Sequence, residues 1–166
     1  NIPAEMHITS NTPLIPAIQT WQAYLNDQGR SHYTVKAFIG DLSLLARYLP
    51  PETAIGNIST EELNQFLEWL KKDRDIPCRP KSLSRRITSL KSFFRWLLLS
   101  GRIDVDPAEK LLQQSVISPL PMVLTMEEQF KVTQTAMKYR TNVKPDARPI
   151  ALLELLLTTG IKKGEC

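Results

Sequence analysis

The sequence predicts an all-α protein with a break near residue 120. Apolar residues recur three and four positions apart through most of the chain, which is the period of a helix with one buried face. Capping residues precede these segments, and Gly or Pro follows them. Alternation of the kind that strands show is confined to very short stretches, so no sheet is expected.

The first helix is predicted to open at Thr12-Pro13, because Thr can cap a helix and Pro is tolerated in its first turn. It should end at Gly29. Its apolar face consists of Leu14, Ile18, Trp21 and Leu25. A second helix should begin at Ser31 and end at Pro50-Pro51. Its broader apolar face consists of Val35, Phe38, Ile39, Leu42, Leu45, Ala46 and Leu49.

A third helix is predicted from the capping box Ser59-Thr60-Glu61-Glu62, in which Ser and Glu can exchange hydrogen bonds. The fourth should run from about Pro80 to Gly101. Its core stripe consists of Leu83, Ile87, Leu90, Phe94, Leu97 and Leu98. Asp106-Pro107-Ala108-Glu109 then predicts a short fifth helix to about Gln114, because a cap, a first-turn Pro and a Glu are in register.

The remaining chain is predicted to be a connector followed by two helices. Pro119 and Pro121 make residues 115–125 an extended connector between two folding units. A second capping box, Thr125-Met126-Glu127-Glu128, starts a helix to about Met137, and an apolar helix runs from Pro149 to Thr159 before Gly160. The expected division is a lead segment at 1–12, a helical domain at 13–114 and a second unit at 126–166. The lead is interpreted as the start of a fragment or as a disordered segment.

Composition narrows the functional classes. No apolar run approaches the roughly 20 residues that span a bilayer, so no membrane partner is expected. Cys78 and Cys166 are 88 positions apart without His or Cys at ligand spacing, which argues against zinc and a disulfide framework and favours the cytoplasm. There is no Gly-rich phosphate loop, no metal cluster and no paired acid and base, so no cofactor is predicted. The Glu pairs at 61–62 and 127–128 are better explained as first-turn caps.

The charge is concentrated in one stretch. Residues 71–102 contain ten basic side chains against two acidic ones, a net charge of +8, whereas the whole chain carries +4. The rest of the chain is therefore −4. Most of these cations lie on the fourth predicted helix, opposite its apolar stripe, where Arg forks, Lys ammonium groups and hydroxyls can meet phosphate oxygens. This pattern predicts a surface for double-stranded DNA.

The candidate DNA-binding side chains lie on two helices. A smaller row on the second helix, at spacings of four, three and four, is Lys36, Gly40, Ser43 and Arg47, which could form a second positive wall. The candidates on the fourth helix are Lys81, Ser82, Arg85, Thr88, Lys91, Ser92 and Arg95, with Arg86 and Lys91 on the shoulders of its apolar stripe. The Trp residues at 21, 69 and 96 are interpreted as packing residues.

Four segments in order resemble one family. These are residues 31–42, with Ser31, Thr34 and Asp41-Leu42; residues 85–97, followed by Gly101 and Asp106-Pro107; residues 119–125; and residues 156–166. Together they resemble the tyrosine recombinases and phage integrases. The resemblance implies a four- to five-helix SAM-like core-binding bundle, a linker and the first helices of a truncated catalytic domain. In that family the second and fourth helices face DNA, as the charge pattern independently predicts.

The resemblance also implies chemistry that needs residues beyond Cys166. Family members cut DNA through a tyrosine that forms a phosphotyrosyl link, without metal, and arginines stabilise the pentacovalent phosphate. This chain ends before such a tyrosine, so we expect a fragment that binds DNA and is itself non-catalytic. Its parent would be a recombinase for DNA integration and recombination, with self-association on DNA allowed.

Lys162 stands where the resemblance places the first catalytic Arg, after Thr158-Thr159-Gly160-Ile161. Lysine carries the charge but lacks the two-pronged geometry. Three alternatives stay open: an impaired parent, a role for Lys163 in a shifted loop, or a protein that bends DNA or blocks sites without cutting. A rival to the DNA hypothesis as a whole is a helical adaptor that docks an acidic protein partner on its basic face.

Overall fold

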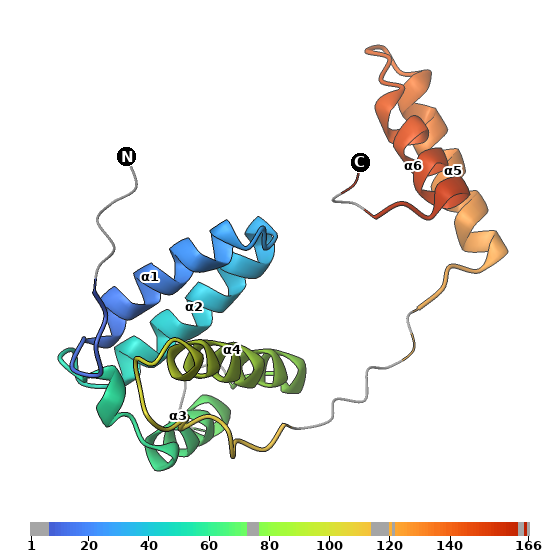
Figure 1. The fold of residues 1–166 in the computed structure, drawn as a ribbon. Helices are drawn as coiled ribbons and strands as arrows, with labels where there is room; N and C mark the ends of the chain where they lie inside the picture. The colour runs from blue at the N-terminus through green and yellow to red at the C-terminus, as the bar shows by residue number, and fades with distance from the viewer. Residues whose placement is uncertain (1–6, 73–76, 114–119, 121, 163–164, 166) are drawn as a thin grey trace. The chain divides into compact units, whose positions relative to one another are not determined.

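The structure is a computed structural model of the chain, and it describes residues 7–72, 77–113, 120, 122–162 and 165. The chain divides into two compact units, Asn1–Ser118 and Pro119–Cys166, and each is described by itself. Within the described ranges the elements are six α-helices and one 3-10 helix, without a strand (Figure 1). The prediction of an all-α fold is confirmed.

Helices α1 (Leu14–Asp27) and α2 (His32–Tyr48) form an antiparallel pair (Figure 1). The turn between them uses Gly29, whose φ of 66° is the left-handed conformation that glycine adopts without a steric cost. Ser31 caps α2, and its hydroxyl accepts a hydrogen bond from the backbone N–H of Thr34 at 3.2 Å. The end of α1 near Gly29 and the start of α2 at Ser31 both lie where the sequence predicted them.

Helix α3 (Thr60–Lys72) begins with the predicted capping box. The Ser59 hydroxyl accepts from the Glu62 N–H at 3.2 Å, and the Glu62 carboxylate accepts from the Ser59 N–H at 2.9 Å. Helix α4 (Pro80–Leu99) follows with Pro80 in its first turn and crosses α2. The predicted stripe on α4 is buried from Leu83 to Leu97, whereas Leu98 is only partly buried against the core.

Apolar side chains from all four helices form one core. Trp21 of α1 is 1% exposed and contacts two rings, Phe93 of α4 edge-on at a centroid distance of 5.3 Å and Phe38 of α2 in a stack at 5.9 Å. Phe66 of α3 is fully buried in the same cluster. Trp69 and Trp96 pack against its edge, so the interpretation of the Trp residues as packing residues is confirmed.

The prediction of a short helix from Asp106 to about Gln114 is wrong for residues 106–113, which are the described part of that range. The chain turns at residues 107–110 instead, and the Asp106 carboxylate accepts from the Ala108 N–H at 2.8 Å. Ala108 and Leu111 are buried in the core of the first unit. Because a helix this short is marginal by itself, burial of these two side chains decides the local conformation.

The cap predicted at Thr12 is also wrong. Pro13 occupies the N-cap position of α1 without a side-chain hydrogen bond, and the Thr12 hydroxyl accepts instead from the Thr9 N–H at 2.9 Å. The described part of the lead belongs to the first unit, because Ile8 is buried in the core. The Gly56 N–H, in the 3-10 helix η1 (Ile55–Asn57), donates to the Ser10 carbonyl at 2.8 Å.

The second unit contains α5 (Met126–Arg140) and α6 (Arg148–Thr159). The predicted capping box at Thr125 and Glu128 is present, and Gly160 ends α6 with a φ of 64°. Among the described residues of this unit, Ala136 and Ile150 are the buried apolar ones, whereas large side chains such as Met126 and Phe130 are exposed. Across the described ranges no helix has the length and apolarity that crossing a membrane requires. The predicted connector 115–125 falls partly on residues outside those ranges.

Candidate nucleic-acid interface

Helix α4 separates its charged side chains from its apolar ones. Its five basic residues are unaccompanied by any acidic residue along the helix. Lys81, Arg85, Thr88 and Arg95 are exposed, Ser82 and Ser92 are half-buried, and the apolar stripe on the other side is buried. The helical period therefore places the predicted cations in contact with solvent.

Arg85 makes an additional contact that its place on α4 does not reveal. Its Nε donates to Asp41 Oδ2 at 3.1 Å, and its Nη2 donates to Asp41 Oδ1 at 2.7 Å. The Asp41 side chain, on α2, is only 4% exposed, whereas the Arg85 side chain is 46% exposed. Arg85 is thus bound to a buried carboxylate along one edge of its guanidinium and open to solvent elsewhere.

Two further donors from α4 complete the Asp41 cluster. Ser89 Oγ donates to Asp41 Oδ2 at 2.8 Å, and Arg86 Nε donates to Asp41 Oδ1 at 3.3 Å. Arg86 is 14% exposed and also donates to the Cys78 sulfur, so it is a structural cation on the shoulder of α4. Asp41 and Ser89 are not among the site residues predicted from the sequence. The Asp-Leu pair at 41–42 was the available signal, but nothing local shows that Asp41 is buried.

The row predicted on α2 lies on the same helix as Asp41. Lys36, Gly40 and Arg47 are exposed, and the Ser43 hydroxyl is turned back to the Ile39 carbonyl at 2.8 Å. Successive residues of a helix point about 100° apart, so this exposed row lies on a different side of α2 from the buried Asp41 that meets Arg85. Helices α2 and α4 contact each other (Figure 1), so the exposed cations of both rows belong to one pair of packed helices.

The chain after α4 covers part of that helix. Lys91 Nζ donates to the Glu109 carbonyl at 3.3 Å, and the Gln113 amide donates to Thr88 Oγ1 at 3.0 Å and to Ser84 Oγ at 3.2 Å. Lys91 and Thr88, both predicted to bind DNA, are thus engaged by residues 109–113. A ligand at Thr88 must compete with the Gln113 amide, whereas the Lys91 ammonium has two N–H groups besides the one that donates to Glu109.

The count of ten cations overstates the free charge. Lys71 and Lys72 both pair with Glu68, one turn earlier on α3, at 2.6 and 3.4 Å, and the Lys71 hydrogen bond lowers the pKa of Glu68. The Arg102 guanidinium lies over the Trp96 ring at 4.4 Å. These three cations are used within the first unit. Arg74 lies outside the described residues.

The exposed cations left in residues 71–102 are Arg79, the N-cap residue of α4, and Lys81, Arg85 and Arg95 on the helix itself. The three on α4 together with two on α2 make five exposed cations, which we call the α2/α4 cationic face. They are Lys36, Arg47, Lys81, Arg85 and Arg95. Of these, Arg85 alone lies within 4.0 Å of a carboxylate in the part of the chain that the structure describes. Because phosphate recognition requires accessible positive groups, this face is the candidate interface.

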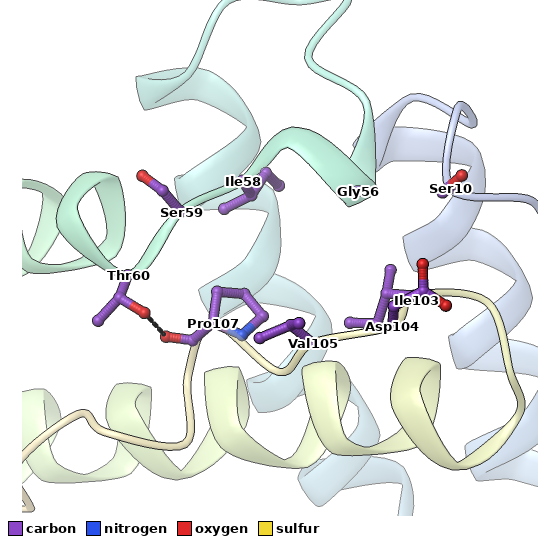
Figure 2. Close-up of a pocket in the computed structure, with 9 residues that line it drawn as sticks. All are labelled: Ser10, Gly56, Ile58, Ser59, Thr60, Ile103, Asp104, Val105 and Pro107. Carbon is purple, nitrogen blue, oxygen red and sulfur yellow. Dashed lines mark hydrogen bonds between the residues drawn. The ribbon is translucent and has the colours of Figure 1, made fainter.

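A pocket of about 310 Å³ lies elsewhere on the first unit (Figure 2). It is bounded by η1, the start of α3 and the segment 103–107, and the Thr60 hydroxyl donates across it to the Pro107 carbonyl at 2.8 Å. Asp104 is the charged residue of its lining. The pocket therefore offers one carboxylate and no basic group for an anionic ligand.

Lys162 lies in the second unit, just after α6. It is exposed, and its backbone N–H donates to the Glu165 carboxylate at 2.9 Å. Lys163, the alternative residue, lies outside the described ranges. The predicted catalytic position is thus on a segment that follows the left-handed Gly160.

Two solved structures share this fold. A lambda integrase dimer bound to a COC' core site matches with a TM-score of 0.65 and 18% identity, over 90% of this chain and 39% of that chain. The integrase from mycobacterium phage Brujita matches with a TM-score of 0.53 and 16% identity, over 88% and 46%. The fold is therefore of the integrase type.

The sequence comparisons identify the family. The model of the phage integrase N-terminal SAM-like domain matches residues 18–101. Tyrosine recombinase XerC from Oceanobacillus iheyensis is 32% identical over 152 residues, which are 90% of this chain and 48% of that protein. XerD from Listeria innocua is 28% identical over 139 residues, 84% and 46%. The chain belongs to the tyrosine recombinase family and spans about half the length of these relatives.

Proposed function

We propose that this chain binds double-stranded DNA through the α2/α4 cationic face. In this proposal residues 13–114 are the core-binding domain of a site-specific tyrosine recombinase, and residues 126–166 begin its catalytic domain. The observation that carries the proposal is the exposure of Lys36, Arg47, Lys81, Arg85 and Arg95 on two adjoining helices. A row of cations on two helices can contact the phosphates on both sides of a groove.

Three facts support the larger assignment. The family model covers the residues that form α2, α3 and α4. The curated relatives are named as recombinases and are about twice as long as the part that matches. In the second unit, large apolar side chains of α5 and α6 are exposed, in keeping with a domain that continues in the longer relatives. The parent protein would cleave and rejoin DNA strands, and Lys162 would lie near the scissile phosphate.

A fluorescence-anisotropy titration with a labelled duplex tests the proposal. If each of the five cations neutralises one phosphate, affinity falls about 500-fold between 50 and 200 mM salt, since each contact contributes a slope of about −0.9. Lys81→Ala should weaken binding and lower that slope by about one. Poly-glutamate serves as the competitor. Salt-insensitive binding to the duplex would contradict the proposal, and displacement of the duplex by poly-glutamate as effectively as by unlabelled DNA would favour the adaptor hypothesis.

A further inference from the structure

Asp41 is acidic and buried, yet its carboxylate binds Arg85, a cation of the face proposed to bind an anion. We infer that Asp41 is a positioning residue for DNA binding, which holds the Arg85 guanidinium in place so that its free edge can take a phosphate. The inference rests on the proposed function. It is carried by the buried Asp41 carboxylate and by the half-exposed Arg85 that this carboxylate binds.

The geometry leaves a complete phosphate-binding edge on Arg85. A guanidinium has five N–H groups in a planar fork. Asp41 accepts one from Nε and one from Nη2, which form the side edge. The two N–H groups of Nη1 and the second of Nη2 remain, and one from each nitrogen forms the end edge that matches two phosphate oxygens. Nη1 has no hydrogen-bond partner elsewhere in the residues that the structure describes.

The local charge stays positive despite the carboxylate. Asp41 meets two guanidinium groups, those of Arg85 and Arg86, so the cluster carries a net charge of +1. Arg86 is mostly buried and Ser89 is fully buried, so Arg85 is the member that a ligand can reach. The negative charge of Asp41 therefore offsets only one of the two positive charges, and the exposed Arg85 remains available to an anion.

Positioning and simple electrostatics predict opposite effects of Asp41→Asn. The substitution raises the net charge by one, so electrostatics alone predicts tighter binding to DNA. It also weakens the bonds that order Arg85, so the side chain must be immobilised on binding, at a cost equivalent to about three- to tenfold in affinity. Weaker binding by a more positive protein would have no simple electrostatic explanation.

The experiment compares Asp41→Asn with a matched control, Asp104→Asn, in the whole chain on one labelled duplex at fixed salt. Asp104 is exposed, and Asp104→Asn raises the net charge of the chain by one, as Asp41→Asn does. We expect Asp41→Asn to bind about three- to tenfold more weakly than the unsubstituted chain, and Asp104→Asn to bind equally or more tightly. Equal or tighter binding by Asp41→Asn would overturn the inference.

A double-mutant cycle separates positioning from a general loss of structure. If Asp41 acts through Arg85, then Asp41→Asn causes no further loss in an Arg85→Ala background. The same loss in both backgrounds would refute the positioning role. Ser89→Ala provides a second route if Asp41→Asn does not fold, because it removes one bond to Asp41 and keeps every charge. It should also weaken binding, and unchanged affinity would count against the inference.

A failure of this inference differs from a failure of the proposed function. If the unsubstituted chain does not bind duplex DNA, the proposed function fails and the inference falls with it. If the chain binds, and Arg85→Ala weakens binding while Asp41→Asn and Ser89→Ala do not, the function stands and the positioning role is excluded.

Discussion

Replacing Arg85 with Ala should destabilise the first unit, in contrast to the equivalent change at Lys81. From the sequence both substitutions are expected to reduce DNA binding with little loss of stability, because both residues lie on the polar side of the fourth helix. The structure changes this expectation for Arg85. Two of the four hydrogen bonds to the buried Asp41 carboxylate come from Arg85, including the shortest, at 2.7 Å.

The magnitude follows from what Asp41 retains. A buried charge left without any partner costs about 3–5 kcal/mol. In Arg85→Ala, Asp41 keeps the Arg86 and Ser89 donors, and water can enter where a side chain 46% exposed has been removed. We therefore expect a loss of about 1–3 kcal/mol in the free energy of unfolding. Lys81 is exposed and has no such partner, so Lys81→Ala should change stability by less than about 0.5 kcal/mol.

Tryptophan fluorescence during urea unfolding is the suitable assay. All three Trp residues, at 21, 69 and 96, lie in the first unit, so the signal reports on that unit alone. Each variant lacks one basic residue of the unsubstituted chain, so Lys81→Ala is the matched control for net charge. Equal stability of the two variants would refute the Asp41–Arg85 bond as a stabilising contact.

Three further results are expected. Ile87→Ala should cost about 2–5 kcal/mol in urea unfolding, because this core side chain is 2% exposed; a smaller loss would contradict the α4 packing. Gly56→Ala should cost about 1–3 kcal/mol, because its new Cβ would lie 2.7 Å from Ser10 Cβ; unchanged stability would contradict that close approach. The Arg148 hydrogen bond lowers the pKa of Asp146 from 3.8 to about 2. The pair therefore stabilises the second unit above about pH 4, and this contribution is lost as pH falls through about 2. An NMR titration should place the pKa of Asp146 near 2 and raise it toward the ordinary value in Arg148→Gln, which removes the guanidinium but keeps the backbone N–H that donates to Asp146.

Much of the helical structure could be predicted from neighbouring residues. The Ser59 and Thr125 capping boxes, the Ser31 cap and the left-handed Gly29 all depend on bonds within a few residues, which the sequence displays directly. The errors came where distant contacts outweighed local signals. Asp106 has the features of a helix start, but burial of Ala108 produces a turn.

The sequence by itself determined which face of each helix is apolar, where the cations of α4 lie, and which family the segments resemble, because these follow from periodicity and short motifs. Only the tertiary structure decided which cations are free. Asp41 and Arg85 are 44 positions apart, and Lys91 donates to the carbonyl of Glu109, 18 positions further along the chain. Such pairings depend on how α2 and α4 cross and on which side chains that crossing buries, and neither is encoded in local spacing.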